Sequence, residues 1–455
     1  MPTRKLTIAS LFRNRRGSVT YRLILAVFGI ALKIFFRRIE TVNADSVPSG
    51  TGMIFVMNHP NGLIDPALVF VALPRRISFL AKSTLFRMPV IGWILRTVGA
   101  LPLYRRIDAG EDVSQNQKTF ELCRELLREG GSIALFPEGV SHNSPQLLPL
   151  KSGASRIAIG AASTKGAEPV NVKIVPVGLY YTNKTTFRSE AMLHFGKGFD
   201  VQPIEPDQNG QPPRDHVKAL TSQIDAALRE VTLNAENEAE LHAARIAEEI
   251  LNSARLEESL GTEFDFQKEF IKETTDDKDV ETDERLGARL RRFDAKLEAF
   301  SLEPEHLSLA LYRRQSVLHE AFHFTWKLLL LAPFAALGVI LHFPAYQVCK
   351  YFSRWYASGS EDIVSTAKVL AGIVFMPLTW LIAAFVTYYF VRSPWALLAI
   401  PLGFLLGYAA LYTLEEFEEA RGWARAIWLF LTKRERFLRL YVERREIQEE
   451  LRAIH

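Results

Sequence analysis

The order of hydrophobic and polar positions changes along the chain, and residues 51–212 show the most regular pattern. Short runs of β-branched and aromatic residues there predict strands at 53–58, 77–82, 132–137, 172–181 and 191–196. Longer amphipathic stretches between them predict helices at 65–73, 90–99, 114–131 and 152–164. This alternation predicts an α/β domain with a mainly buried sheet, whose functional residues follow the strand ends.

Beyond residue 212 the pattern predicts helices only. Residues 213–322 carry many charges at helical spacing, which predicts a charged helical unit. Within the predicted membrane domain at 323–415, apolar runs at 369–391 and 395–414 each reach the roughly 20 residues that a membrane span needs. They are separated by a short polar connection and predict a C-terminal transmembrane helical hairpin. The run 328–341 is shorter, so we expect a short interfacial or re-entrant helix there.

Both ends of the chain are basic. In the N-terminal segment 1–50, the run 23–36 predicts an amphipathic helix at the membrane interface, with a cleaved or spanning segment as the alternative. The tail at 416–455 predicts a basic amphipathic helix, either on the membrane surface or in the cytosol. The net charge is only +4, so nothing indicates nucleic acid, and the basic ends fit the lipid bilayer. With two spans, the positive-inside tendency predicts that the α/β domain and the basic tail both lie on the cytoplasmic side of an integral membrane protein.

Cysteine and histidine usage argues against a disulfide framework, a catalytic thiol and a metal site. Two cysteines cannot form a disulfide framework, and Cys123 occupies a core position of a predicted helix, which makes a catalytic thiol improbable. The histidines outside the motif described below have no convincing third ligand at metal-binding spacing. We therefore expect neither a metal nor a cofactor.

The stretch MIFVMNHPNGLIDPALVF, at residues 53–70, places a histidine and a carboxylate on either side of a turn. Asp65 before Pro66 is typical of a helix start, with Asp65 as the N-cap and Pro66 as the first helical residue. Taken alone, His59 and Asp65 could both be structural. Three further blocks change this interpretation: GALPLYRR (99–106), LFPEGVSH (135–142) and IVPVGLYY (174–181).

In this order, the four blocks resemble the PlsC-like glycerophospholipid acyltransferase family, whose members acylate glycerol 3-phosphate or 1-acylglycerol 3-phosphate. The remaining chain resembles the branch of fungal glycerol-3-phosphate/dihydroxyacetone-phosphate acyltransferases. The resemblance implies that His59 is the general base and Asp65 its orienting partner, without an acyl-enzyme. It also implies acceptor and phosphate binding by Arg105, Glu138 and Gly139. Further expected contacts are Arg106, Ser141 and Lys151.

The spacing in the first block departs from the family pattern, because five residues instead of four separate His59 from Asp65. In a continuous helix this insertion would rotate the carboxylate by about 100°. Pro60-Asn61-Gly62 predicts a turn that can absorb the extra residue.

These observations predict a membrane-bound O-acyltransferase of phospholipid synthesis. It would transfer a fatty acyl group from acyl-CoA or acyl-carrier-protein to a hydroxyl of a glycerol-3-phosphate-type acceptor. A histidine with a pKa near 6.5 suits the removal of the alcohol proton at neutral pH. The alternatives are a lysophospholipid-remodelling acyltransferase and, in a different class, a catalytically silent membrane scaffold.

Overall fold

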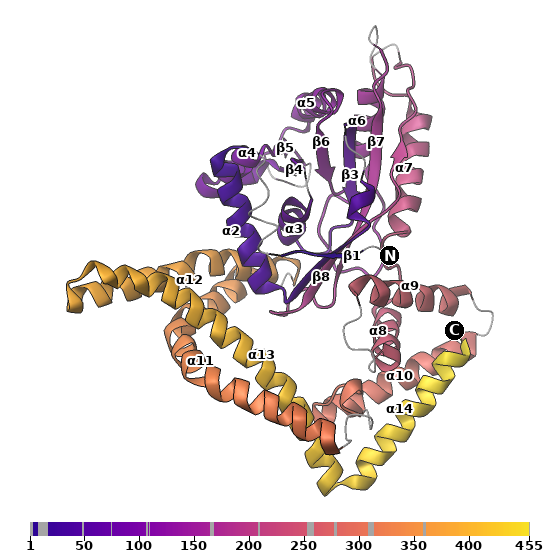
Figure 1. Ribbon diagram of the computed structural model, residues 1–455. Helices are drawn as coiled ribbons and strands as arrows, with labels where there is room; N and C mark the ends of the chain where they lie inside the picture. The colour runs from indigo at the N-terminus through magenta and orange to yellow at the C-terminus, as the bar shows by residue number, and fades with distance from the viewer. Residues whose placement is uncertain are drawn as a thin grey trace. The chain divides into compact units, whose positions relative to one another are not determined.

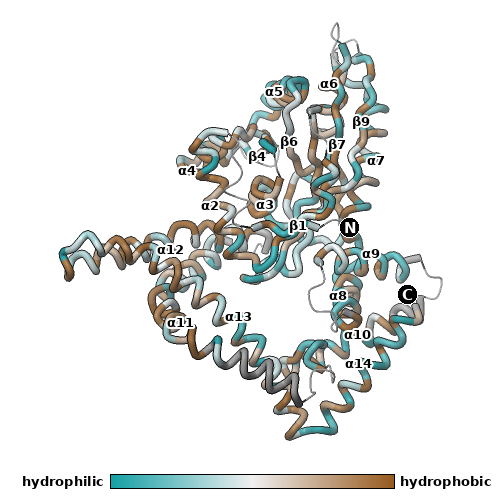
Figure 2. The backbone as a smooth tube through the Cα atoms, viewed as in Figure 1, coloured by the Kyte–Doolittle hydropathy of each residue, from teal (hydrophilic) through white to brown (hydrophobic). Residues whose placement is uncertain are grey.

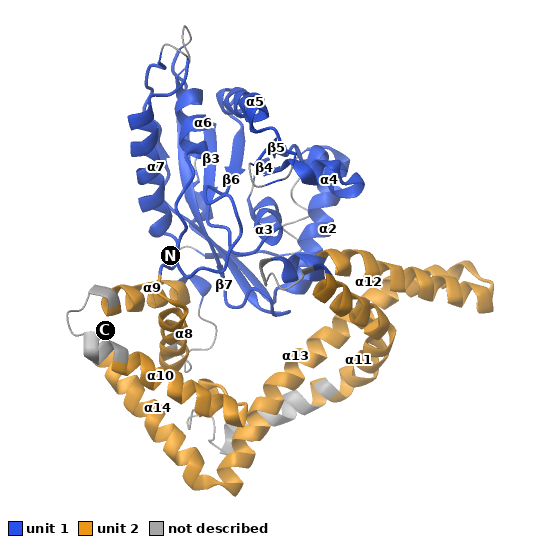
Figure 3. Ribbon diagram, turned by 180° about the vertical axis from the view of Figure 1, so that it is seen from behind, with its two compact units in different colours: residues 1–234, 259–261, 356–369 blue, residues 235–258, 262–355, 370–455 orange. Residues whose placement is uncertain are grey.

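The computed structural model divides the chain into two compact units (Figure 3). Unit 1 comprises Met1–Asn234, Ser259–Gly261 and Tyr356–Val369, and unit 2 comprises Ala235–Glu258, Thr262–Trp355 and Leu370–His455. The residues that the structure describes are 3–7, 17–47, 50–73, 75–105, 108, 110–163, 168–207, 210–252, 259–276, 280–307, 314–357 and 361–454.

Unit 1 is built around a mixed sheet, which has nine strands in the described part of the chain (Figure 1). The strand order is β1-β2-β8-β7-β3-β6-β4-β5, with β9 paired to β7. The central strand β3 lies parallel to both β6 and β7, whereas β8 lies antiparallel to β7. The strands are β1 (Thr3–Lys5), β2 (Arg38–Val42), β3 (Gly52–Met57), β4 (Ser78–Lys82), β5 (Leu101–Leu103), β6 (Ser132–Leu135), β7 (Val172–Tyr181), β8 (Glu190–Phe195) and β9 (Phe199–Asp200).

Helices cover both faces of this sheet (Figure 1). Side chains of β3 alternate between the faces, and Ile54 and Val56 lie in one buried cluster with residues of α5, α6 and α7. On the other side of the sheet, α2 contacts α3 and α4. The helices are α2 (Val19–Phe35), α3 (Ile64–Ala72), α4 (Pro89–Val98), α5 (Asn116–Arg128), α6 (Gly153–Ala162) and α7 (Arg214–Arg229).

The predicted α/β fold is confirmed, and each predicted strand and helix of residues 51–212 is present within a few residues. Two boundaries differ. The sheet includes β2, which precedes the expected domain start at residue 51. The predicted charged unit beginning at residue 213 loses its first helix to unit 1, because Val217, Leu220, Ile224 and Leu228 on one face of α7 are buried in the core of the α/β domain.

The N-terminal helix α2 has two apolar faces. Tyr21, Leu25 and Leu32 are buried within unit 1, whereas Val19 and Leu23 are exposed by 74% and 62%. The expected helix is therefore present, and its inner face belongs to the fold. The expected interfacial position of its outer face stays a prediction.

The regular elements in the described part of unit 2 are helices. Three stretches of the described residues are long and apolar enough to cross a membrane: Leu329–Tyr356, Ile363–Val391 and Pro394–Thr432. Figure 2 shows the apolar residues along α11 and α12. The helices that lie wholly or mainly in this unit are α8 (Glu238–Asn252), α9 (Leu260–Asp276), α10 (Val280–Phe300), α11 (Arg314–Ala357), α12 (Glu361–Val391), α13 (Ala399–Thr432) and α14 (Arg434–Ile454).

The expectation of a short helix at 328–341 is wrong. Helix α11 runs from Arg314 to Ala357 and continues through Pro333 and Pro344. Proline is tolerated inside such apolar helices because neighbouring helices and local adjustments satisfy the freed backbone groups. Its apolar part, Leu329–Tyr356, is therefore also long enough to cross a membrane, and the C-terminal apolar helices fit a membrane segment.

The predicted tail helix at 416–455 is divided, because residues 416–432 continue α13 and only α14 forms a separate helix, which packs within unit 2. Phe437, Ile447 and Leu451 of α14 are buried completely. On the polar side of α14, Glu446 and Glu450 accept hydrogen bonds from Arg289 of α10 at 2.7 and 2.6 Å. Of the two sequence-based alternatives, these contacts favour a helix packed on protein over one lying on the membrane surface.

Candidate active site

The site forms where the central parallel strands of unit 1 end. In the sheet register, Val56 of β3 pairs with Leu135 of β6, and Met57 of β3 pairs with Val177 of β7. The carboxyl ends of β3 and β6 therefore meet at one edge of the sheet, and β7 continues past them to Tyr181. Three sequence blocks far apart in the chain come together here, because the loop after each strand opens on the same edge.

The turn after β3 brings His59 and Asp65 into contact. His59 Nδ1 lies 2.8 Å from Asp65 Oδ2, and the Asp65 side chain is completely buried. A carboxylate only accepts hydrogen bonds, so Nδ1 carries the proton and Nε2 keeps its lone pair. The imidazole also stacks on Phe136, with ring centroids 4.0 Å apart and 16° between the planes. The ring is therefore held in one orientation with Nε2 available as a base.

The helix after this turn begins earlier than predicted. Helix α3 starts at Ile64 with Leu63 as its N-cap, so the reading of Asp65 as the cap is wrong. Asn61 O accepts the N–H groups of Ile64 and Asp65, which closes a tight turn before the helix. Asp65 Oδ2 in return accepts the Asn61 N–H at 2.7 Å. The turn absorbs the fifth intervening residue, as predicted, and leaves the carboxylate facing His59.

Glu138 lies in the loop after β6 and is 2% exposed. Its Oε1 accepts the backbone N–H of His59 at 3.0 Å, and its Oε2 accepts the N–H of Leu148 at 2.9 Å. Oε2 also pairs with His142 Nε2, and the N–H of His142 donates to His59 O at 3.1 Å. Glu138 thus joins two loops around the dyad, and its expected contact with an acceptor hydroxyl would compete with these protein donors.

Arg105 is held next to the same loop. Its Nε and Nη2 donate to the two oxygens of Asp108 at 3.0 and 3.1 Å, and its Nη1 donates to Gly139 O at 3.2 Å. Lys82 Nζ lies 3.1 Å from Asp108. The hydrogen bond from Arg105, the largest contribution, and the contact with Lys82 lower the pKa of the Asp108 carboxyl below its ordinary value. A guanidinium has five N–H bonds, and Arg105 uses three of them for Asp108 and Gly139. Among the described residues, up to two N–H bonds therefore remain for a phosphate.

Of the remaining predicted site residues, the structure describes Gly139, Ser141 and Lys151. Gly139 has φ +75°, and a Cβ there would come within 2.4 Å of Lys151 Nζ, so the lysine side chain lies across the glycine. Lys151 N–H also donates to Pro137 O at 2.8 Å. Ser141 lies in the same loop and is half-buried. Arg106 lies outside the described residues.

Tyr181 is a site residue that the sequence did not single out. Its hydroxyl donates to Asp65 Oδ1 at 2.6 Å, and both side chains are buried. Burial and the neighbouring Asp65 charge raise the pKa of Tyr181 well above its ordinary value, so the phenol stays a donor. The sequence predicted a strand at 172–181 but gave Tyr181 no role in the site. No sequence signal marks this tyrosine, because its partner is 116 residues away.

A thiol nucleophile is excluded at Cys123. The side chain is completely buried in the core, and burial raises the pKa of its thiol to about 12. A thiol with so high a pKa contains almost no thiolate at neutral pH.

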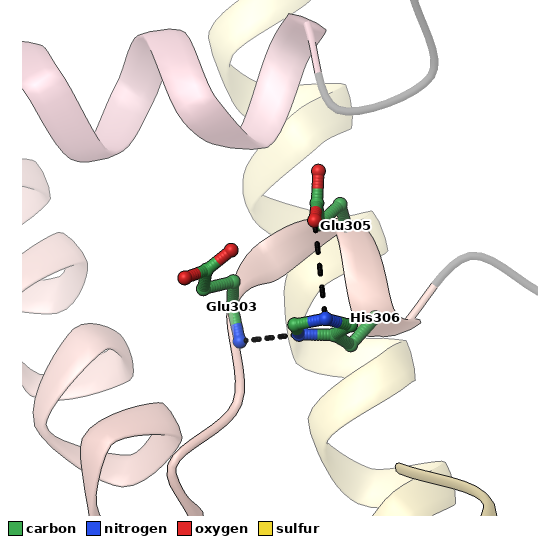
Figure 4. A group of neighbouring side chains, drawn as sticks. All are labelled: Glu303, Glu305 and His306. Atoms are coloured by element: carbon green, nitrogen blue, oxygen red, sulfur yellow. Dashed lines mark hydrogen bonds and ion pairs between the residues drawn. The ribbon is translucent and has the colours of Figure 1, made fainter. Parts of the chain in front are cut away.

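Among the described residues, one group of histidine and carboxylates lies close enough to hold a metal: Glu303, Glu305 and His306 of unit 2 (Figure 4). His306 Nδ1 accepts the Glu303 N–H at 2.9 Å, which leaves the ring proton on Nε2, facing Glu305 at 3.8 Å. A protonated ring nitrogen cannot bind a metal. In this arrangement the group serves as a hydrogen-bonded turn.

Two family matches cover most of the chain. Residues 38–180 match the family described as Acyltransferase, and residues 244–455 match the Glycerol-3-phosphate acyltransferase 2 C-terminal domain. The first match contains His59, Asp65, Arg105 and Glu138, and the second contains the predicted membrane helices.

Curated relatives agree with both matches. An uncharacterized acyltransferase of Schizosaccharomyces pombe is 23% identical over 82% of this chain and 69% of that protein. Glycerol-3-phosphate O-acyltransferase 2 of Saccharomyces cerevisiae is 25% identical over 58% of this chain and 37% of that protein. The chloroplastic 1-acyl-sn-glycerol-3-phosphate acyltransferase BAT2 of Brassica napus is 31% identical over 35% of this chain and 43% of that protein.

A solved structure is also similar. The 1-acyl-sn-glycerophosphate acyltransferase PlsC of Thermotoga maritima matches with a TM-score of 0.32 and 18% identity, over 49% of this chain and 86% of that chain. We infer the α/β architecture from the sheet of unit 1, and the similarity to acyltransferases from the sequence matches. The sequence therefore matches the PlsC-like acyltransferase family, near the fungal glycerol-3-phosphate acyltransferases.

Proposed function

We propose that this protein is a membrane-bound O-acyltransferase that moves a fatty acyl group from a thioester to a hydroxyl of a glycerol-3-phosphate-type acceptor. The acceptor would be glycerol 3-phosphate or 1-acylglycerol 3-phosphate. The observation that carries this proposal is the pairing of His59 Nδ1 with the buried Asp65 at 2.8 Å. It leaves Nε2 as a base at the end of the central strand, in a domain of the acyltransferase family.

The chemistry that this pairing supports is a direct transfer. Nε2 of His59 removes the acceptor's hydroxyl proton while the oxygen attacks the thioester carbonyl, and the resulting tetrahedral intermediate expels the thiolate. The proton held on His59 then passes to the thiolate, which restores the base and releases the thiol. General-base catalysis typically contributes roughly 10²- to 10⁴-fold, and Asp65 stabilises the imidazolium that forms.

Arg105 is the proposed phosphate ligand. Asp108 and Gly139 fix the plane of its guanidinium beside the loop that holds Glu138. A fixed guanidinium recognises a phosphate better than a mobile one, because less side-chain entropy is lost on binding. Lys151, which lies across Gly139, would add positive charge to the same phosphate.

The acyl donor would be acyl-CoA or acyl-carrier-protein, without a cofactor. A membrane setting suits this reaction, because the acyl chain partitions into lipid while the phosphate stays in water. The three apolar helices and the exposed apolar side chains of α2 support this setting. We place the catalytic domain, together with the basic N-terminal segment, on the cytoplasmic side, following the positive-inside tendency. If all three apolar helices cross the membrane, the basic tail lies on the opposite side.

The experiment uses purified full-length protein in lipid nanodiscs. Labelled acyl-CoA, or acyl-carrier-protein in parallel, is supplied with glycerol 3-phosphate, dihydroxyacetone phosphate or 1-acylglycerol 3-phosphate, and the lipid products are separated. We expect acylation of at least one acceptor by the wild type and none by His59→Ala. Folded wild type that acylates none of the three would contradict the proposal. Acylation only of a lysophospholipid with a larger head group, supplied in a parallel reaction, would favour a remodelling enzyme.

A further inference from the structure

The first turns of α12 belong to unit 1, although this helix is one of the three that are apolar enough to cross a membrane (Figure 3). Two polar side chains there, Ser365 and Thr366, are buried to 0% and 8% exposure. Polar side chains at such a position cost free energy unless they form hydrogen bonds, so their partners indicate why they are present.

Thr366 contacts the turn that carries the catalytic dyad. Its Oγ1 accepts the backbone N–H of Leu63 at 3.1 Å. Leu63 is the N-cap of α3, and no side chain of the turn itself caps this helix. The N–H groups at a helix start have no partner inside the helix. A hydroxyl from α12, 303 residues away, satisfies one at the junction between His59 and Asp65.

Ser365 reaches the same turn through the loop after β7. Its Oγ donates to Lys184 O, which also accepts Asn61 Nδ2 at 3.2 Å. Asn61 is completely buried, and its own N–H donates to Asp65 Oδ2 at 2.7 Å. One turn further along α12, Lys368 Nζ donates to Thr185 O at 2.8 Å. Continuous hydrogen bonds therefore connect α12 with the dyad carboxylate.

We infer that Ser365 and Thr366 are positioning residues for the His59–Asp65 dyad, and that the first turns of a candidate membrane helix form part of the active-site scaffold. The inference rests on the proposed function of the dyad. Its consequence is that the position of the first turns of α12 sets the geometry of the dyad. A displacement of about 1 Å at a reacting group can cost roughly 10²-fold in rate, so a few hydrogen bonds at the turn are enough to matter.

The test replaces Thr366 with valine, which has nearly the same volume but cannot accept the Leu63 N–H. Thr387→Val is the matched control, because Thr387 is exposed on the same helix and its hydroxyl donates to Ala383 O of that helix. Each full-length variant in nanodiscs is studied by hydrogen–deuterium exchange of the peptide covering residues 58–66 and by steady-state kinetics.

We expect faster exchange in residues 58–66 of Thr366→Val and a kcat about 10-fold lower, with the KM for the acyl donor unchanged. Thr366→Ser, which restores the acceptor, should recover both. Exchange and kcat equal to those of Thr387→Val would overturn the inference. The exchange measurement needs no turnover, so it tests the anchor even if the proposed acyl transfer fails. If Thr366→Val does not fold, Ser365→Ala provides the same two measurements.

Discussion

Tyr181 donates its phenolic hydrogen to Asp65 Oδ1 at 2.6 Å, while His59 Nδ1 lies 2.8 Å from Oδ2 of the same carboxylate. The carboxylate is thus held on both sides, by Tyr181 of β7 and by His59. Because the pKa of Tyr181 is raised well above its ordinary value, this hydrogen bond persists at physiological pH. The orientation of the dyad therefore depends on the sheet as well as on its own turn.

Removing the phenolic hydroxyl should weaken catalysis without weakening substrate binding. In Tyr181→Phe, Asp65 Oδ1 loses its buried hydrogen-bond donor. This loss costs about 1–3 kcal/mol, because the carboxylate is less firmly oriented and its charge is less well stabilised. We expect kcat to fall about 10-fold with unchanged KM values, measured by initial rates at saturating acyl donor. Tyr346→Phe, on an exposed position of α11, is the control. A changed KM with normal kcat would assign Tyr181 to substrate binding instead.

Glu138 should act as an organiser of the two loops. Glu138→Gln replaces one acceptor oxygen by a donor amide, which then faces one of the N–H donors of His59, Leu148 or His142. We expect a kcat about 10-fold lower and a less stable domain, by about 1–3 kcal/mol, from rates and from thermal unfolding. Glu125→Gln, on the exposed side of α5, should change neither. If Glu138→Gln raised only the acceptor KM, Glu138 would contact the acceptor, as the sequence indicated.

Arg105→Lys should raise the KM for the phosphate-bearing acceptor. Lysine keeps the charge but cannot donate to Asp108 with two nitrogens while it also reaches Gly139 O and a phosphate. We expect a KM about 10- to 100-fold higher and a kcat within about twofold of wild type, corresponding to the loss of one charged hydrogen bond of about 1.5–3 kcal/mol. Arg229→Lys, at an exposed ion pair of α7, is the control. An unchanged acceptor KM would remove Arg105 from phosphate binding.

His306 should make unit 2 less stable in acid. Burial lowers its pKa below the ordinary value near 6.5, so the unfolded chain binds the proton more readily than the folded one. The free energy of unfolding of unit 2 is then highest above about pH 6.5 and decreases as the pH falls below that value. We expect the unfolding temperature to drop by about 2 °C or more between pH 7.5 and 5.5. His306→Asn should reduce this drop and exposed His216→Asn should leave it unchanged, whereas equal drops in all three proteins would contradict the assignment.

The sheet was predictable where its strands are buried on both faces. Strands β3, β6 and β7 read as continuous apolar runs, as central parallel strands do. The edge strand β1 (TRK) and the short β5 (LPL) have no such signal, because three residues, one of them proline in β5, do not define a period. The length of α11 was underestimated because its internal prolines predict helix ends when the neighbouring helices are unknown.

The candidate site was predictable as far as its motifs extend. His59, Asp65, Arg105 and Glu138 all lie in recognisable blocks, and the structure brings these blocks to one edge of the sheet. Tyr181 and Thr366 could not be found in this way. Their contacts with the dyad turn cross 116 and 303 residues, and only the folded sheet and the start of α12 bring them together.

The most direct test of the account is a kinetic double-mutant cycle on the dyad. His59→Ala, Asp65→Ala and the double variant are compared with wild type in kcat, using the acceptor identified in the substrate panel. If His59 is the base and Asp65 acts only through it, His59→Ala should lose about 10³-fold or more, and the double variant should be no slower than His59→Ala. Substantial activity in His59→Ala, or losses that multiply in the double variant, would contradict the account.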